Sequence, residues 1–228
     1  MEIIRTNTPT QDAGKRLTEV LRAHQKNPIL LLLSGGSAFS ILPYAMSAPL
    51  DELLTISVLD ERFTHDPAGQ NFTQLQTTTF GNDALQKGAR MIDLTIKQED
   101  SRESVAERFA QALRDWSAAH PDGVIVATMG IGTDGHTAGI MPHVEEVDFD
   151  GAEWVVDYTT PLGANPFPER ITVTHTFLST MVNHAIVYAI GDEKQPYVSA
   201  LEDGDGDRQE MPAYILRSMR DVVLYTTA

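Results

Sequence analysis

VIVATMGIGTDGHTAGIMP, residues Val124–Pro142, decides how the rest of this chain is interpreted. Its first four residues are apolar and mostly β-branched, which is typical of a buried strand. Glycines at positions 130, 132 and 135 break this run, and the loop that they form carries Asp134 and His136. Glycine permits tight turns and a close approach of the backbone to a ligand. Because ligands bind outside the carboxyl ends of parallel strands, we expect His136 to lie at the functional edge of a sheet.

Strand and helix patterns alternate along the rest of the chain. Residues 10–24 place Ala13, Leu17 and Leu21 at helical spacing, and the apolar run 29–33 reads as a strand buried on both faces. Similar patterns predict further strands at 55–59, 91–94, 170–174, 184–190 and 222–225, and helices at 38–46, 71–80, 100–119, 175–183, 193–201 and 212–219. This alternation predicts a three-layer α/β/α sandwich around a largely parallel, Rossmann-like sheet, formed by residues 1–228 as a single domain.

Three local features refine this pattern. Asp100, with Glu103 three residues later, has the form of a capping box at a helix start. The triplet Asp60-Glu61-Arg62 directly follows a predicted strand and is expected at its end. The acidic stretch 143–157 shows no regular periodicity, so we expect it to be irregular.

Composition excludes several classes of protein. The 228 residues are 42% apolar and 21% charged, and no run approaches the roughly 18 apolar residues of a membrane helix. The absence of cysteine excludes disulfides and thiolate chemistry, and with no signal-peptide pattern at the start we expect a cytoplasmic protein. A net charge of −15 has the wrong sign for binding nucleic acid or an anionic membrane. We expect a monomer or a small homo-oligomer in which any anionic substrate meets a local basic cluster.

The glycine spacing of the central stretch also matches a dinucleotide-binding fingerprint. Gly130-x-Gly132-x-x-Gly135 has the required form, and Asp157 lies about 20 residues further on. The fingerprint must open a helix, however, and Pro142 leaves too little room for one. We therefore do not favour nucleotide binding.

Other polar clusters have both a structural and a functional interpretation. Ser34-Gly35-Gly36-Ser37 follows a predicted strand and could be a tight turn or an anion-binding nest. Asp60-Glu61-Arg62 could be surface ion pairing or part of a site. Arg170 and Lys194 are cations near strand ends in a chain with only 17 Lys and Arg. His136 and His143 lack the spacing of zinc ligands, so we expect no metal.

Taken together, four motifs resemble those of the 6-phosphogluconolactonases and of the glucosamine-6-phosphate deaminases that share their fold. In chain order they are Leu33-Ser-Gly-Gly-Ser-Ala38, Asp60-Glu-Arg62 with Asn71, Gly130-Ile-Gly-Thr-Asp-Gly-His-Thr-Ala138, and Arg170-Ile-Thr-Val-Thr174 with Gly191-x-x-Lys194. The long glycine-rich signature is specific, and the others are strong as an ordered set. The resemblance implies hydrolysis of 6-phospho-D-glucono-1,5-lactone to 6-phosphogluconate in the pentose phosphate pathway, without a metal or an organic cofactor.

The resemblance also implies roles for the candidate residues. Hydrolysis of a lactone needs a base for water, stabilisation of an oxyanion and a proton for the leaving ring oxygen. His136 would be the base, because imidazole titrates near neutrality, and either Asp134 or Asp60 would orient it. The phosphate-binding residues would be Arg170, Lys194 and the loop residues Ser34, Gly35, Gly36 and Ser37, with Arg62 adding positive charge.

Departures from the family pattern keep two alternatives open. Ala38-Phe39 stands where Thr-Pro is usual, and Gly139-Ile-Met-Pro142 stands where Ser-Leu-Phe-Pro is typical. The deaminases place a catalytic glutamate five residues after the signature histidine, where this chain has Met141. A sugar-phosphate isomerase or deaminase is therefore the weaker interpretation. A non-catalytic phosphosugar-binding regulator is the other, although a pure binder has no need of a base at His136.

Overall fold

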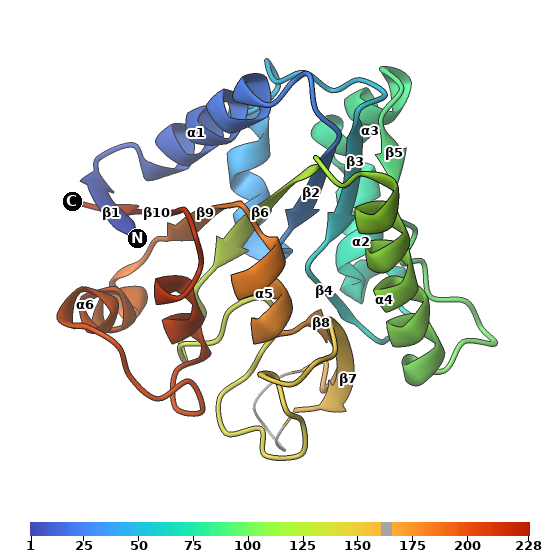
Figure 1. Ribbon diagram of the computed structural model, residues 1–228. Coiled ribbons are helices and arrows are strands. Elements are labelled where there is room, and N and C mark those ends of the chain that lie inside the picture. The colour runs from blue at the N-terminus through green and yellow to red at the C-terminus, as the bar shows by residue number, and fades with distance from the viewer. Residues whose placement is uncertain (161–165) are drawn as a thin grey trace.

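A seven-stranded sheet forms the centre of the protein, whose computed structural model describes residues 1–160 and 166–228 (Figure 1). All of its strand pairs are parallel. Their order across the sheet is β1 (Glu2–Thr6), β10 (Val222–Thr227), β9 (His184–Ala189), β6 (Val124–Gly130), β2 (Ile29–Leu33), β3 (Leu54–Val58) and β5 (Arg90–Met91). The predicted α/β architecture around a largely parallel sheet is confirmed.

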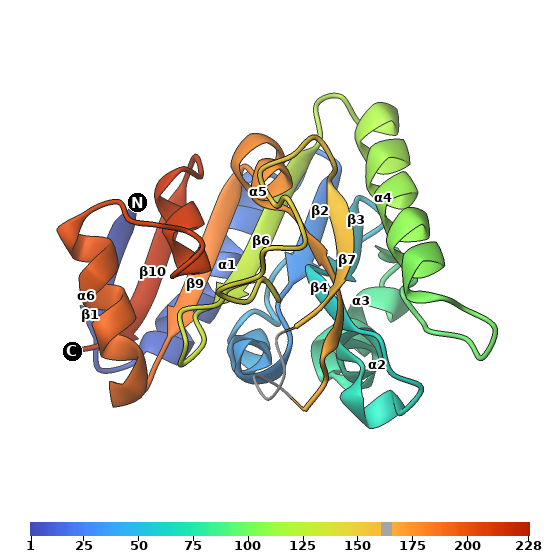
Figure 2. The same ribbon diagram turned by 90° about the horizontal axis from the view of Figure 1, so that it is seen from below.

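The middle of the sheet is made by the apolar runs that the sequence marks as strands. Every residue of β2 is buried, and Leu31 lies opposite Ile56 of β3 on one side and Val126 of β6 on the other. Figure 2 shows these strands side by side with β9 and β10. The edge strand β1 was missed, because five partly exposed residues give no strong periodicity.

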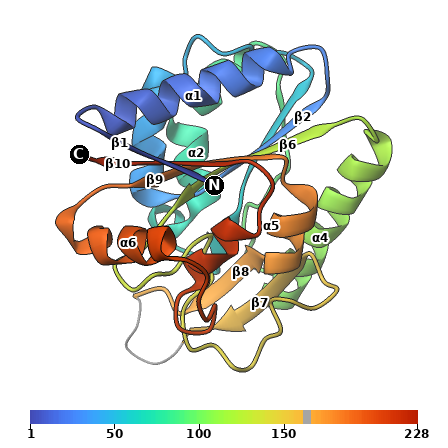
Figure 3. The ribbon, with the colours of Figure 1, turned by 60° about the vertical axis from the view of Figure 1, so that its left-hand side comes forward.

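Helices cover both faces of this sheet. One face carries α1 (Pro9–Ala23), the 3₁₀ helix η1 (Gly36–Tyr44), α2 (Asn71–Thr77) and α3 (Thr79–Gln86); the other carries α4 (Arg102–Ala119), α5 (His175–Met181) and α6 (Gln195–Asp203). Figure 3 shows α1 on one side of the nearly edge-on sheet and α5 and α6 on the other. Short 3₁₀ turns η2 (Pro67–Gly69), η3 (Asp192–Lys194) and η4 (Pro212–Arg217) complete the described elements. Among the described residues, none of the helices combines the length and apolar character needed to cross a bilayer.

A second, three-stranded antiparallel sheet lies beside the carboxyl edge of the first. Its order is β4 (Asp60–Arg62), β8 (Glu169–Val173) and β7 (Val155–Thr159). Leu59 joins the two sheets, since its N–H donates to Leu33 and its carbonyl accepts from Val173. The expectation of an irregular stretch through residue 157 is wrong at β7, whose strand conformation depends on pairing with β8 rather than on its own periodicity.

Expected helices differ from the described ones in kind or extent, among them the one at 212–219, which is the 3₁₀ helix η4. The helix expected at 38–46 is the 3₁₀ helix η1, which begins two residues earlier and contains Pro43, a residue that cannot donate a backbone hydrogen bond. The helix expected at 71–80 is two helices, because Thr78 adopts an extended conformation and its hydroxyl caps α3 by accepting from the N–H of Gly81.

The predicted N-cap of α4, Asp100, is also wrong. Ser101 caps the helix by accepting from the N–H of Ser104, and its own N–H donates to the Ser104 hydroxyl. Asp100 instead accepts from the N–H of Lys97 and from Arg108. Both arrangements give a similar sequence pattern, so only the fold distinguishes them.

Candidate active site

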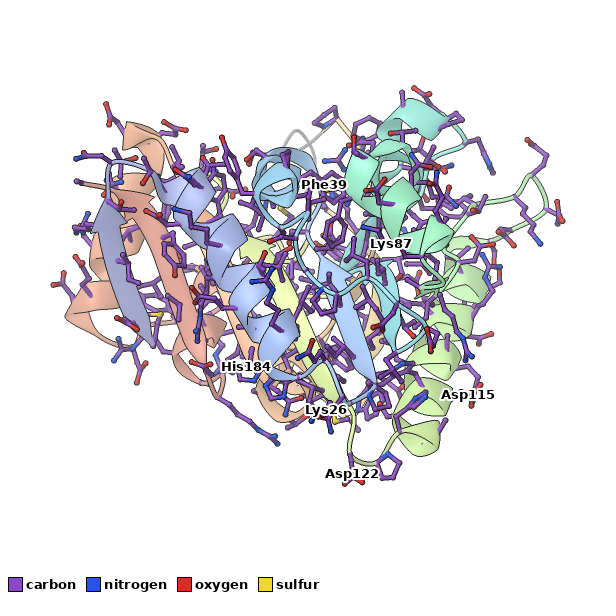
Figure 4. The ribbon with its side chains drawn as sticks, turned by 90° about the horizontal axis from the view of Figure 1, so that it is seen from above. Lys26, Phe39, Lys87, Asp115, Asp122 and His184 are labelled. Atoms are coloured by element: carbon purple, nitrogen blue, oxygen red, sulfur yellow. The ribbon has the colours of Figure 1, made fainter. Side chains whose placement is uncertain are left out.

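A pocket of about 310 Å³ lies where β2 and β6 end, beside β4, β8 and η3. Figure 4 shows the direction of the strands: Lys26, Asp122 and His184, which precede or begin strands, lie at one end of the molecule, and Phe39, which follows β2, lies toward the other. The pocket is lined by nearly all the predicted site residues, namely Ser34, Gly35, Gly36, Ser37, Asp60, Arg62, His136, Arg170 and Lys194. The remaining one, Asp134, contacts His136. The fold therefore brings together residues that are up to 160 positions apart in the chain.

Asp134 and His136 form a pair in the loop after β6. Oδ1 of Asp134 lies 2.5 Å from Nδ1 of His136 and 3.1 Å from its backbone nitrogen. An ionised carboxylate only accepts hydrogen bonds, so Nδ1 is the donor and Nε2 keeps its lone pair. Burial of Asp134 disfavours its charged form, but the hydrogen bonds from His136, together with the charge that the ring carries when protonated, outweigh burial and hold the pKa of Asp134 below its ordinary value. Asp134 thereby fixes the position of the His136 ring.

The glycine at position 132 is required by this pair. A Cβ atom there would lie 2.1 Å from Nδ1 of His136, which is too close for any side chain. The loop is closed by the Gly132 N–H, which donates to the His136 carbonyl, and by the Thr137 hydroxyl, which donates to the Gly130 carbonyl. Residues 131–154 contain no helix, so the requirement of the dinucleotide fingerprint is not met. The glycine spacing shapes a histidine loop instead.

Asp60 occupies a different part of the pocket from the Asp134–His136 pair. Its Oδ2 accepts from Nδ2 of Asn71 at 3.2 Å and lies 3.7 Å from Nη1 of Arg170. The side chain of Arg170 is only 4% exposed, and burial lowers its pKa, an effect that the charge of Asp60 opposes. Of the two carboxylates between which the sequence left the choice open, Asp134 is the one hydrogen-bonded to the imidazole. Asp60 balances the charge of a buried guanidinium.

The remaining cations and the glycine loop surround the same space. β2 ends at Leu33, and the loop 34–37 leads into η1, whose first N–H groups have no partners within the helix. Lys194 reaches the pocket from η3. Arg62 donates to the Gly69 carbonyl, and its guanidinium lies 5.3 Å from the centre of the Phe167 ring. Backbone donors and cations thus line one pocket in a chain of net charge −15.

Two residues near the pocket were not predicted to have a role. Asn71 lines the pocket and is almost fully buried. Glu61 is fully buried, and its carboxylate accepts a hydrogen bond from the Asn71 backbone N–H. The family-like segment containing both was recognised, but a short polar triplet and a distant asparagine give no local signal of mutual contact. Within residues 1–160 and 166–228, no group of three or more His, Cys, Asp or Glu side chains is arranged to hold a metal ion.

A larger groove, of about 1080 Å³, lies between α4 and residues 146–157. It contains none of the predicted site residues, and the Arg114–Glu153 ion pair lies on its surface. Its charged side chains are paired or exposed, in contrast to the buried Arg170 and the oriented His136. The smaller pocket is therefore the candidate active site.

A parallel sheet with a polar pocket at its carboxyl edge defines an α/β protein with a small-molecule site. The chain belongs to the family of glucosamine-6-phosphate isomerases/6-phosphogluconolactonases, whose family model matches residues 6–225. It is 28% identical over 222 residues to a 6-phosphogluconolactonase of Rhizobium meliloti (strain 1021), which covers 94% of this chain and 90% of that protein. A 6-phosphogluconolactonase of a Nostoc species is 24% identical over 205 residues, or 87% of this chain and 82% of that one.

Solved structures show the same fold. The structure of 6-phosphogluconolactonase from Trypanosoma brucei superposes with a TM-score of 0.77 at 21% identity, covering 99% of this chain and 95% of that one. The 6-phosphogluconolactonase from Trypanosoma cruzi gives a TM-score of 0.76, also at 21% identity, with 99% and 94% of the two chains covered. The likeness extends over the whole of the α/β sandwich.

Proposed function

We propose that this protein hydrolyses 6-phospho-D-glucono-1,5-lactone to 6-phosphogluconate in the pentose phosphate pathway. The observation that carries the proposal is the Asp134–His136 pair, which leaves Nε2 of His136 without a hydrogen-bond partner among the described residues, in a pocket that also contains Arg170 and Lys194. Relatives in the same family that bear the name 6-phosphogluconolactonase support this substrate. The protein would act in the cytoplasm on a free phosphosugar lactone, as a monomer or small homo-oligomer with one domain.

The chemistry follows from the arrangement of the pocket. Nε2 of His136 removes a proton from a water molecule as its oxygen attacks C1 of the lactone, and the carbonyl electrons move onto the oxygen. The tetrahedral intermediate then collapses, the bond from C1 to the ring oxygen breaks, and the imidazolium returns the proton to that oxygen. Asp134 stabilises the imidazolium that forms between the two steps. In this mechanism the Asp134–His136 pair both accepts and returns the proton, and no metal is invoked.

Binding of the phosphate is assigned to the other side of the pocket. Arg170 can contact two phosphate oxygens with its planar guanidinium, and Lys194 adds a point charge. The backbone of residues 34–37 supplies N–H donors, and Arg62 contributes to the positive potential. Asp60, in contact with Arg170, holds the guanidinium in place between turnovers.

The deaminase alternative finds no support at residue 141. Met141 is 2% exposed, and it lines a separate cavity with His175 rather than the pocket of His136. A glutamate is therefore missing from the position at which the resemblance would require one. The non-catalytic regulator is disfavoured by the Asp134–His136 pair, because a binding protein gains nothing from an oriented base.

One assay separates these functions. Lactone generated by glucose-6-phosphate dehydrogenase is supplied fresh, and acid release is measured above the spontaneous rate. The proposal predicts release that is proportional to enzyme concentration, together with no ammonia from glucosamine 6-phosphate. Acid release at the spontaneous rate only, at any enzyme concentration, would exclude the lactonase.

A further inference from the structure

Glu61 lies at the junction between the second sheet and α2. Its side chain is fully buried, and both carboxylate oxygens accept hydrogen bonds from the backbone. Oε1 accepts from the N–H of Arg62 at 2.7 Å and of Asn71 at 2.6 Å, and Oε2 accepts from the N–H of Phe72 at 2.7 Å. A single carboxylate therefore fixes the start of α2 against β4.

Asn71, held by Glu61, connects two parts of the pocket. Its Nδ2 donates to the carbonyl and to the carboxylate of Asp60, at 2.9 and 3.2 Å. Its Oδ1 faces Gly35 of the expected phosphate loop so closely that a Cβ atom at position 35 would lie 2.1 Å from it. Oδ1 is buried and has no hydrogen-bond partner among the described residues. The amide is thus packed between Asp60 and the glycine loop.

The contacts continue from Asp60 to the buried cation. Oδ2 of Asp60 lies 3.7 Å from Nη1 of Arg170, while Nε of Arg170 donates to the Phe167 carbonyl. The N–H of Arg62 also donates to Glu61, and Arg62 lies opposite Arg170 in the register of β4 and β8. Glu61 does not line the pocket, yet the residues it holds include two that do.

We infer that Glu61 is a positioning residue that sets the affinity of the pocket for its phosphorylated ligand, acting through Asn71 and Asp60 on the glycine loop and Arg170. The identity of that ligand rests on the proposed function. The Asp134–His136 pair belongs to the loop after β6, and no hydrogen bond or ion pair among the described residues joins it to this network, so Glu61 acts on binding rather than on the proton-transfer step.

The protonation state of Glu61 distinguishes a positioning role from simple packing, because only the positioning role predicts an affinity that changes with pH. Burial raises its pKa to about 7, an effect that the Phe72, Arg62 and Asn71 N–H groups oppose and the charge of Asp60 adds to. The guanidinium of Arg170 also interacts electrostatically with the Glu61 carboxylate. Above this pH the ionised carboxylate accepts three charge-assisted hydrogen bonds; below it a proton occupies one oxygen and weakens them. The hydrogen bonds by which Glu61 holds the start of α2 against β4 are therefore strongest at alkaline pH.

The experiment compares the wild-type protein with Glu61→Gln and with the matched control Glu107→Gln, which removes an equal charge from an exposed site on α4. Binding of 6-phosphogluconate is measured by calorimetry at pH 6, 7 and 8. We expect Glu61→Gln to raise the Kd about 10-fold at pH 8, the size of one lost charge-assisted hydrogen bond, and much less at pH 6. The control should match the wild type throughout.

Steady-state kinetics and folding are followed on the same variants. Glu61→Gln should raise KM by a similar factor at pH 8 and leave kcat within about threefold, because the His136 loop is untouched. Circular dichroism reports whether the variant is folded. A ratio of variant to wild-type Kd that stays constant between pH 6 and 8, or equal affinities at every pH, would overturn the inference.

A second measurement keeps the inference independent of the substrate. If the wild-type protein binds no 6-phosphogluconate, the proposed function fails. The positioning of the pocket by Glu61 is then tested separately by NMR. The side-chain amide of Asn71 and the backbone amide of Gly35 should shift with one titration near pH 7 that is lost in Glu61→Gln. Amide shifts that are unchanged by this substitution would show that Glu61 does not position the pocket.

Discussion

His136 is the single residue on which the proposed chemistry depends most. Replacement by Asn keeps a polar side chain of similar size but removes the proton acceptor. His136→Asn should therefore retain the fold and ligand binding while lowering kcat by roughly 10²–10⁴-fold. The measurement is kcat and KM for freshly generated lactone, with circular dichroism as the control for folding. A near-wild-type kcat would rule out this residue as the base.

Arg170 and Lys194 are expected to contribute to binding rather than to proton transfer. Arg170→Lys should weaken the binding of 6-phosphogluconate, because an ammonium cannot reproduce the two-point contact and would leave Asp60 with a poorer partner. Lys194→Ala should mainly raise KM.

The double variant tests whether the two cations act on one group. Its loss of binding free energy should differ from the sum of the single losses, since both side chains would hold the same phosphate. Kd values from calorimetry for the four proteins give this coupling. Strict additivity, or indifference of both single variants, would contradict a shared phosphate site.

At the scale of elements, the end of α1 is joined to the beginning of β9 by two histidines. Nε2 of His24 lies 3.0 Å from Nε2 of His184, whose Nδ1 lies 2.7 Å from Asp221. Arg16 lies 3.7 Å from the same carboxylate. This junction is at the amino edge of the sheet, where Figure 4 shows His184, and is remote from the candidate site.

The junction predicts a pH dependence of stability. Burial, and then the charge of His184, lower the pKa of His24 below its ordinary value, so the folded state favours the neutral ring. The stabilisation is present above the pKa of the unfolded chain, about 6.5, and is lost as the pH falls below it, because the unfolded state then binds the proton more readily. The melting temperature should fall between pH 7 and 5.

The matched variant for this prediction is His24→Gln, whose amide can still donate to His184 but cannot titrate. Its melting temperature should fall less over the same pH range than that of the wild type. The difference between the two curves isolates the half-buried His24 from the buried His175, whose pKa burial also lowers. Parallel curves would show that the junction does not contribute.

At the scale of the whole molecule, net charge opposes the ligand that the pocket is built to accept. A charge of −15 repels a phosphorylated sugar at long range, but salt screens this field within about 8 Å at physiological ionic strength. Affinity must then come from the local cations and backbone N–H groups. 6-Phosphogluconate should raise the melting temperature, because a ligand at 100 times its Kd stabilises the native state by about 2.7 kcal/mol.

Unphosphorylated gluconate is the control for this prediction. At the same concentration it should change the melting temperature little, since it lacks the group that Arg170 and Lys194 would hold. Thermal unfolding with each ligand in turn makes the comparison. Equal stabilisation by the two compounds would remove the phosphate site.

The sequence by itself determined the elements whose pattern is local. Buried strands such as β2 are continuous apolar runs, and α1 carries its apolar residues at helical spacing, so neither needs knowledge of its neighbours. The glycine-rich loop after β6 placed His136 at the carboxyl edge for a general reason, namely that parallel strands all end there. The family motifs then allowed nearly all the pocket residues to be named.

Tertiary structure alone decided which side chains meet. β7 and β8 belong to a separate antiparallel sheet because β8 pairs with β7 on one side and with β4 on the other, and this long-range pairing leaves no period in the sequence. Asp134, two residues from His136, orients the imidazole, whereas Asp60 pairs with Arg170 from a different strand. Glu61 reads as one charge in an acidic chain, and only burial against three backbone N–H groups makes it a support of the pocket. Burial and pairing partners are properties of the folded chain, so they could not be read from residue types.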